Sequence, residues 1–241
     1  MRIHTYPFGN INLKLMSGKR KSTGVSRSSY NLSKIIPELK NLEVLDLGSG
    51  IGYMSVGALL LGAKRVIAVD IDDVVPIIKK NLVINNLPKN KLKFCMGNLF
   101  ENIGLHSKFD VIIANLPQHA LPATSLARKL TGKYGGYDGT DIVCRSLAEA
   151  VYYLRANGRY YGSISELTNF KRTFLIAKSL YKVTNIFTIE KELKRGEMSP
   201  WISDQTLLTH LKKLKFLGMI NFESKKGLVT YKVHACEFQK K

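Results

Sequence analysis

Short apolar runs alternate with segments of helical length over residues 43–164 of this 241-residue chain. The expected strands are residues 43–47, 65–69, 92–95, 111–114 and 158–164. The expected helices between them are residues 51–61, 72–85 and 140–154. Strands that alternate with helices form a mainly parallel sheet with helices on both faces. The pattern therefore predicts an α/β domain, in which ligands bind beyond the carboxyl ends of the strands.

The two ends of the chain follow a less regular pattern. Residues 1–32 are expected to form a basic, strand-rich arm with a loop at 17–24, and residues 33–241 the main domain. Ser33 is expected to cap a short helix through Ile35 and Ile36. The further expected elements are a strand at 183–189, a helix at 204–216 and a hairpin formed by 219–222 and 229–236. A helix before a basic hairpin also fits a winged helix, but the helix pair that should precede it is missing. An insertion at about 190–228, between the last two strands, is therefore favoured.

A glycine-rich run, Asp46-Leu47-Gly48-Ser49-Gly50-Ile51-Gly52, connects the first of these strands to a helix. Glycines let the backbone approach a ligand closely, and the helix start supplies free N–H groups. Asp70 ends the next strand, where an acid can accept hydrogen bonds from ribose hydroxyls. The run departs from the dinucleotide fingerprint G-x-G-x-x-G, because Tyr53 stands where the third glycine belongs. Asp46 instead favours a ligand such as S-adenosylmethionine, which carries an ammonium group and no pyrophosphate.

With these residues the chain resembles the class I S-adenosylmethionine-dependent methyltransferases over roughly residues 24–190. The resemblance implies a Rossmann-like fold with a mainly parallel seven-stranded sheet, and S-adenosylmethionine as the cofactor. It implies that Gly48, Ser49 and Gly50 border the methionine part of the cofactor and that Asp46 faces its amino group. It also implies contacts to the ribose and the adenine, from Asp70, Ile71, Asn98 and Leu99. Asn98 fits a helix cap or a turn equally well.

The fourth strand ends in Asn115-Leu116-Pro117-Gln118-His119. The amide oxygen of Asn115 and the carbonyl of Leu116 can converge on an N–H₂ group and aim its lone pair at a methyl group. The reaction is an in-line displacement in which positioning and electrostatics dominate, so neither a metal nor a covalent nucleophile is expected. His119 is interpreted as a loop residue in contact with solvent rather than as a proton acceptor.

This segment resembles the Asn-Pro-Pro-aromatic motif of amino-methylating class I enzymes. In particular it is similar to the small-domain group, which includes release-factor glutamine and guanine-N2 ribosomal RNA methyltransferases. The resemblance implies catalytic roles for Asn115, Leu116, Pro117 and Gln118, and an amino or amide nitrogen as the target. Leu116 and Gln118 depart from the motif. The run Gly135-Gly136-Tyr137-Asp138-Gly139 resembles the turn before the next helix in the glutamine methyltransferases, and the loop 121–136 is expected to be a functional lid.

The formal net charge of +19 predicts attraction to polyanions such as RNA or the ribosome. A lysine-rich solvated surface is the alternative. Arg27 and Tyr30 are expected either to cover the cofactor or to lie on the surface. No apolar run reaches membrane-spanning length and no signal core is present, so we expect a cytoplasmic protein. The three cysteines are far apart in the sequence, so neither a metal site nor a disulfide framework is expected.

Three functions fit these observations. The first is an N-methyltransferase that acts on RNA or another translation-related macromolecule, although the helical N-terminal domain of release-factor enzymes is missing. The second is a small-molecule N- or O-methyltransferase, with an apolar pocket wall built from Met198, Trp201 and Phe216. The third is a non-catalytic Rossmann-like module that binds RNA through its basic arm.

Overall fold

Seven strands lie side by side in one sheet, in the order β5-β4-β3-β6-β7-β10-β8. The structure is a computed structural model that describes residues 2–16, 25–225 and 228–241. The sheet strands are β3 (Glu43–Leu47), β4 (Arg65–Asp70), β5 (Leu92–Met96), β6 (Phe109–Ala114), β7 (Leu154–Ser165), β8 (Tyr181–Leu193), β9 (Glu223–Lys225) and β10 (Leu228–Lys240). Neighbours from β5 to β7 are parallel, and β10 runs antiparallel to β7 and β8. The three-residue β9 pairs with β10 as an eighth strand.

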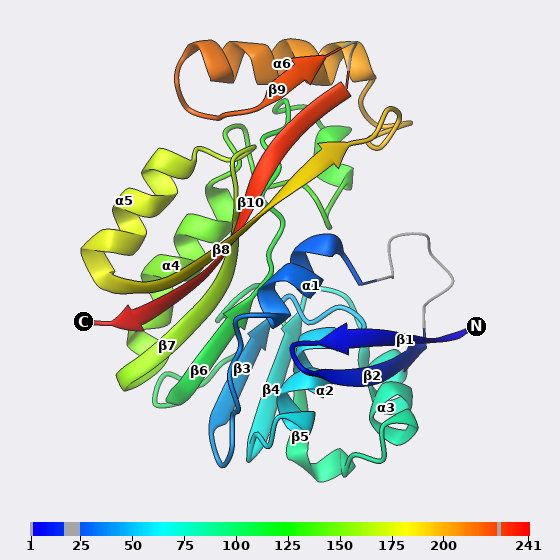
Figure 1. Ribbon diagram of the computed structural model, residues 1–241, viewed down its shortest axis with the longest axis vertical. Coiled ribbons are helices and arrows are strands. Elements are labelled where there is room, and N and C mark those ends of the chain that lie inside the picture. Colours follow the sequence, from blue (N-terminus) through cyan, green and yellow to red (C-terminus); the bar gives the residue numbers. More distant parts are fainter. Residues whose placement is uncertain (1, 17–24, 226–227) are drawn as a thin grey trace.

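Helices cover both faces of this sheet (Figure 1). They are α1 (Arg27–Ser33), α2 (Tyr53–Leu60), α3 (Val75–Ile84), α4 (Asp141–Tyr153), α5 (Phe170–Leu180) and α6 (Asp204–Phe216), with 3₁₀ turns η1 (Lys89–Lys91) and η2 (Ala127–Lys129). Alternate residues of β3 point to opposite faces: Val44 packs with α1 to α3, and Leu45 packs with α4 and α5. The mainly parallel α/β fold predicted from the sequence is therefore confirmed.

The N-terminal segment is an antiparallel hairpin of β1 (Ile3–Phe8) and β2 (Ile11–Met16) that packs on α2 and α3. Asn81 of α3 accepts a hydrogen bond from the Met16 N–H at 2.7 Å. Asn85 binds both the N–H and the carbonyl of Lys14. The expected loop at 17–24 lies outside the described residues, as do Lys226 and Gly227 of the expected C-terminal hairpin turn.

The helix expected after Ser33 is wrong, because α1 begins earlier and ends at that residue. Ser26 is its N-cap, and the Ser26 hydroxyl accepts a hydrogen bond from the Ser29 N–H at 3.0 Å. Residue Ile36 precedes Pro37, and the proline ring disfavours helical geometry at the residue before it. A helix through Ile36 is therefore blocked, whereas a serine cap favours one that begins at Arg27.

The segment between β8 and β10 packs over the end of the sheet that is at the top of Figure 1. Its apolar residues form a third cluster with the loop that follows β6. The cluster includes Leu193, Met198, Ile202, Leu207, Leu211 and Leu214 on one side and Ala120, Leu121 and Ala127 on the other. Within the described residues, no helix is long and apolar enough to cross a bilayer.

Candidate active site

The glycine-rich loop turns sharply between β3 and α2. Gly48, Gly50 and Gly52 all adopt left-handed backbone conformations, with φ of 71°, 51° and 87°. The N–H groups of Gly48 and Ser49 both donate to the Val69 carbonyl, at 2.9 and 3.0 Å. A Cβ atom on Gly48 would lie 3.1 Å from Leu116 Cδ2. The loop therefore packs directly against the segment that follows β6, as the sequence predicted for two halves of one site.

Asp70 closes this loop from the neighbouring strand. Its Oδ2 accepts a hydrogen bond from the Gly50 N–H at 2.7 Å, and its Oδ1 accepts one from the Asp72 N–H at 3.1 Å. An ionised carboxylate has about four lone-pair positions, so both oxygens retain capacity for ribose hydroxyls. Ile71 is 51 % exposed beside it and offers an apolar surface to an adenine ring.

Asp46 lies beneath the loop and is buried. Its Oδ2 accepts a hydrogen bond from the Ser55 hydroxyl at 2.5 Å. Burial raises the pKa of this carboxyl to about 7, the Ser55 hydrogen bond opposes the shift, and the charge of Asp70 adds to it. A cation bound at the loop would stabilise the ionised form of Asp46.

These features fit S-adenosylmethionine. The buried Asp46 carboxylate suits its ammonium group, and the Ile71 side chain suits its adenine. The Ser49 hydroxyl is buried and has no hydrogen-bond partner among the described residues, which is costly unless a ligand supplies one. The loop, Asp70 and Ile71 together would hold the cofactor.

Asn98 and Leu99 follow β5 at the same edge of the sheet. The Asn98 N–H donates to Glu101 Oε2 at 3.2 Å, as in a local turn. Leu99 has a left-handed φ of 58° and packs its side chain into the core. Any contact of Leu99 with adenine would therefore involve its main chain, and the turn geometry of Asn98 leaves both of its predicted roles open.

Asn115 lies at the carboxyl end of β6 and is held by the start of α1. Its Nδ2 donates to Ser29 Oγ at 2.7 Å and to Ser26 Oγ at 3.3 Å. With Nδ2 bound in this way, Oδ1 is the atom left to accept a hydrogen bond from a substrate. Neither serine was predicted from the sequence, although serine is a preferred N-cap residue and Ser26 directly precedes the helix.

The Gln118 amide binds other parts of the protein, contrary to its predicted catalytic role. Its side chain is buried, with Oε1 accepting from the Ser165 N–H at 2.6 Å and Nε2 donating to the Ser163 carbonyl at 2.8 Å. Nε2 also donates to the Leu116 carbonyl oxygen at 3.3 Å. An amide can satisfy these backbone groups and an aromatic ring cannot, so Gln118 braces the loop from behind. Pro117, which lies between Leu116 and Gln118 in the sequence, is half-buried.

The Gly135–Gly139 turn supports the same loop. A Cβ atom on Gly135 would lie 2.5 Å from Gln118 Cα, and one on Gly139 would lie 2.6 Å from the Gln118 carbonyl oxygen. Asp138 accepts hydrogen bonds from Thr140 and from Asn169 Nδ2, and so ties the start of α4 to the start of α5. The tight backbone approach explains why glycine occupies these positions.

His119 is partly exposed, as the sequence predicted, but its ring packs inward. Its Nε2 is enclosed and has no hydrogen-bond partner among the described residues, and its ring lies edge-on to Tyr231 at 6.4 Å between centroids. Burial lowers the pKa of His119 to about 4, and the charges of Lys133 and Lys191 contribute. The imidazole is therefore neutral at neutral pH.

The predicted apolar wall of a small-molecule pocket does not form. Met198 lies in the third core cluster, whereas Phe216 is 91 % exposed. Trp201 lies partly exposed, 5.5 Å below the Lys129 ammonium group. These three side chains do not line one cavity, because the helical face that carries the core leucines turns Phe216 outward.

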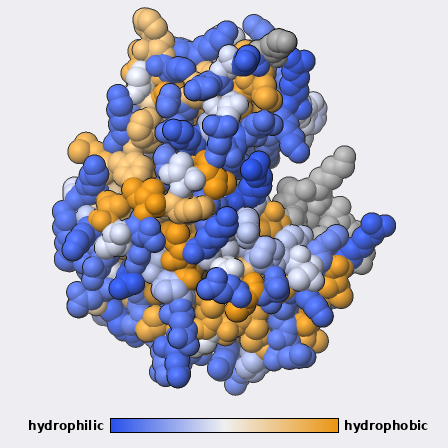
Figure 2. All heavy atoms as spheres, viewed as in Figure 1, coloured by the Kyte–Doolittle hydropathy of each residue, from blue (hydrophilic) through white to orange (hydrophobic). Residues whose placement is uncertain are grey.

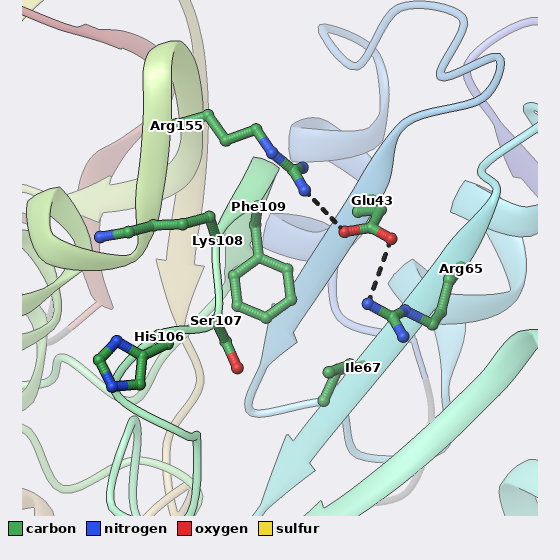
Figure 3. A pocket seen from close by; sticks show the side chains of 8 residues that line it. All are labelled: Glu43, Arg65, Ile67, His106, Ser107, Lys108, Phe109 and Arg155. Carbon is green, nitrogen blue, oxygen red and sulfur yellow. Dashed lines mark hydrogen bonds and ion pairs between the residues drawn. The ribbon is translucent and has the colours of Figure 1, made fainter.

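A pocket of about 400 Å³ lies at the opposite edge of the sheet (Figure 3). It is lined by first residues of strands, including Glu43, Arg65 and Phe109. Arg155 and Arg65 flank Glu43 at 2.9 and 3.1 Å, so their charges are already paired. Ligands of open α/β sheets bind at the carboxyl ends of the strands, and the predicted site lies there instead.

The geometry and the comparisons with known proteins agree. A model of the ribosomal protein L11 methyltransferase family (PrmA) matches residues 28–134. A protein of Methanocaldococcus jannaschii, provisionally named a protein N5-glutamine methyltransferase, is 35 % identical over 161 residues, which cover 64 % of this chain and 78 % of that protein. The chain belongs to the class I S-adenosylmethionine-dependent methyltransferases. It is thus an enzyme, and S-adenosylmethionine is its cofactor.

Further relatives share parts of this methyltransferase or its fold. The ribosomal protein L11 methyltransferase of Fusobacterium nucleatum is 34 % identical over 107 residues, or 43 % of this chain and 34 % of that protein. The chain thus spans about a third of that relative. The solved structure of the T. thermophilus 16S rRNA N2 G1207 methyltransferase with AdoMet and guanosine has a TM-score of 0.60 at 16 % identity, covering 100 % of this chain and 50 % of that one. A Pyrococcus horikoshii protein, provisionally described as an RNA methyltransferase, has a TM-score of 0.52 at 23 % identity, covering 84 % and 76 %.

Proposed function

We propose that this methyltransferase methylates an amino or amide nitrogen of a translation-related macromolecule. The observation that carries the proposal is the orientation of Asn115, whose Nδ2 donates to Ser29 and whose Oδ1 is thereby left as an acceptor. The Leu116 carbonyl accepts one hydrogen bond from Gln118 Nε2 and has a second lone pair. Oδ1 and this second lone pair would form an acceptor clamp for the two hydrogens of an N–H₂ group.

The clamp accounts for the chemistry without a strong base. S-adenosylmethionine supplies the methyl group when it is bound. Two acceptors that hold the hydrogens of the nitrogen would fix the direction of its lone pair and favour the positive charge that develops on it. An amide or aniline-type nitrogen loses its proton readily after methylation. His119, with a pKa of about 4, is too weak a base to be needed.

The names of the relatives support the class of target. They specify N5 of glutamine, ribosomal protein L11 and N2 of a guanine in 16S rRNA. Glutamine N5 and guanine N2 are both nitrogens with two hydrogens. A target of this class would place the enzyme in the cytoplasm.

Transfer of a labelled methyl group into a cell extract tests the proposal. The enzyme is incubated with extract and methyl-labelled S-adenosylmethionine, and the products are separated by size, then treated with ribonuclease or protease and hydrolysed. We expect label in a macromolecule and on nitrogen, and its loss with Asn115→Ala. Label in small metabolites, or on carbon or oxygen, would contradict the proposal.

A binding measurement separates the cofactor site from the acceptor site. Asp70→Ala is expected to weaken S-adenosylmethionine binding about 10- to 150-fold, as for lost hydrogen bonds to a charged group. Isothermal titration calorimetry measures this, and Asn115→Ala is the matched control because it should leave cofactor affinity within about twofold of the wild type.

A further inference from the structure

Aromatic and basic side chains that are far apart in the sequence meet between α1 and β8. Arg27, Tyr30 and Lys34 come from α1 and its C-cap, and Phe187 and Lys191 come from β8. We call these five residues the α1–β8 surface. Tyr30 and Phe187 are 38 % and 40 % exposed. Figure 2 shows mostly hydrophilic side chains on this side of the molecule, with hydrophobic ones between them over the middle, where α1 and β8 lie.

The two elements are joined by specific contacts. The Lys34 ammonium group lies 4.7 Å from the centre of the Tyr30 ring and 5.1 Å from that of Phe187. The Lys191 ammonium group donates to Ser28 Oγ at 3.1 Å. Residues 187 and 191 point to the same face of the strand and are separated by about 13 Å at the usual rise per residue. These contacts hold the two rings and the ammonium groups of Lys34 and Lys191 in place, and Arg27 lies on the same helix.

Acidic side chains do not neutralise these cations. Among the described residues, Arg27, Lys34 and Lys191 form no ion pair within 4.0 Å. Glu197 of the insertion binds Lys133 at 2.6 Å. Burial lowers the pKa of Lys191, and the charge of Glu197 opposes this shift without a direct ion pair. Glu190 lies beside Lys191 in the strand, so its side chain points to the other face. The α1–β8 surface is left with a net positive charge.

The surface adjoins the acceptor clamp through α1 itself. Ser29, whose hydroxyl binds Asn115, stands directly before Tyr30 and directly after Ser28. The contacts of α1 with Asn115 and with Lys191 therefore lie within one helical turn, so a molecule bound along α1 and β8 would lie near Asn115. The surface is suited to the methyl acceptor and not to the cofactor, which the glycine-rich loop would hold.

We infer that the α1–β8 surface binds a single-stranded segment of RNA, the methyl acceptor. Arg27, Lys34 and Lys191 contact phosphates, and bases stack on Tyr30 and Phe187. Lys34 covers both rings in the free protein, and its flexible side chain moves to a phosphate when a base takes its place. An acidic peptide would satisfy the cations but would leave two exposed rings without a flat partner. The inference rests on the proposed function and narrows its substrate to RNA.

Binding of a fluorescent single-stranded RNA of about 15 nucleotides, measured by anisotropy over a range of salt, tests this inference. We expect Phe187→Ala to weaken binding about 5-fold or more and Phe187→Trp to restore it, because a ring is needed for stacking. Lys34→Gln and Lys191→Gln should each reduce the slope of log affinity against log salt by about 0.7. The matched controls are Tyr152→Ala, a 72 % exposed ring on α4, and Lys178→Gln on α5, both on the other face of the sheet.

Three outcomes would overturn the inference. They are no RNA binding by the wild type, equal losses in the control variants, and competition by poly-glutamate as strong as by unlabelled RNA. Circular dichroism of each variant shows whether it is folded. If Phe187→Ala does not fold, the lysine variants and Phe187→Trp still test the inference. If the RNA inference is wrong, the proposal of a nitrogen target can still hold, because the extract experiment would then find the label in protein.

Discussion

The Nδ2 atom of Asn115 lies 2.7 Å from the Oγ atom of Ser29, although the two residues are 86 positions apart. The hydrogen bond selects one of the two orientations of the amide and turns its oxygen away from α1. The first turn of α1 therefore determines which atom of the candidate catalytic residue can meet a substrate.

This relationship predicts different effects for its two partners. Asn115→Ala is expected to lower kcat about 100- to 1000-fold, since it removes an acceptor that acts in the transition state. Ser29→Ala should lower kcat about 10-fold with little change in the KM for S-adenosylmethionine, and Ser29→Thr should restore it because the hydroxyl remains. Steady-state kinetics on the labelled substrate measure these values. An unchanged kcat in Ser29→Ala would exclude the positioning role.

The turn behind the loop predicts a steric effect. Gly135→Ala places a methyl group 2.5 Å from Gln118 Cα, so the Asn115–Gln118 backbone must shift. We expect at least a 10-fold loss of kcat/KM, because small displacements of positioning groups are costly. Gly132→Ala is the control, since its Cβ would meet nothing within 4 Å. Similar activity in the two variants would contradict this account of the turn.

The buried carboxyl of Asp46 predicts a pH dependence of stability. Burial raises its folded-state pKa from 3.8 to about 7, so the folded protein holds a proton that the unfolded chain releases between these values. The free energy of unfolding therefore contains a contribution that falls as pH rises from about 4 to about 7. Asp46→Asn should remove this contribution, so that denaturant unfolding at several pH values gives a less negative slope than in the wild type.

Asp46 also links pH to cofactor binding. The ammonium group of S-adenosylmethionine favours the ionised carboxyl, so wild-type affinity should fall as pH drops from about 8 to about 6. Titration calorimetry should find this dependence weaker in Asp46→Asn. If both proteins have the same pH dependence, Asp46 does not face the ammonium group.

His119 predicts the opposite slope in the same range. Its folded-state pKa is lowered from 6.5 to about 4, so the unfolded chain binds a proton first as pH falls. Its contribution to stability is complete above pH 6.5 and is lost as pH falls toward 4. His119→Asn should remove that loss, measured by urea unfolding at pH 7 and pH 5. His119→Asn should leave the pH profile of kcat unchanged above pH 6. Replacement of a general base would change that profile.

Local patterns in the sequence were sufficient for much of the fold. The alternation of apolar strands and helices predicted the order of elements from β3 to β7, because burial of both sheet faces requires it. The helix predicted after Ser33 was wrong, because Pro37 and the N-cap Ser26 determine where the helix lies. The eighth strand, β9, is only three residues long and has no pattern of its own.

The sequence by itself determined where the cofactor loop and the segment after β6 begin, since each follows an apolar strand at the same edge of a parallel sheet. Only the tertiary structure decided what the side chains there contact. It buried Gln118 against β7, enclosed the Nε2 atom of His119, and brought Ser29 to Asn115 and Lys34 to Phe187. The physical reason is that these contacts join residues far apart in the chain, and sheet register and helix packing, rather than local propensity, bring them together.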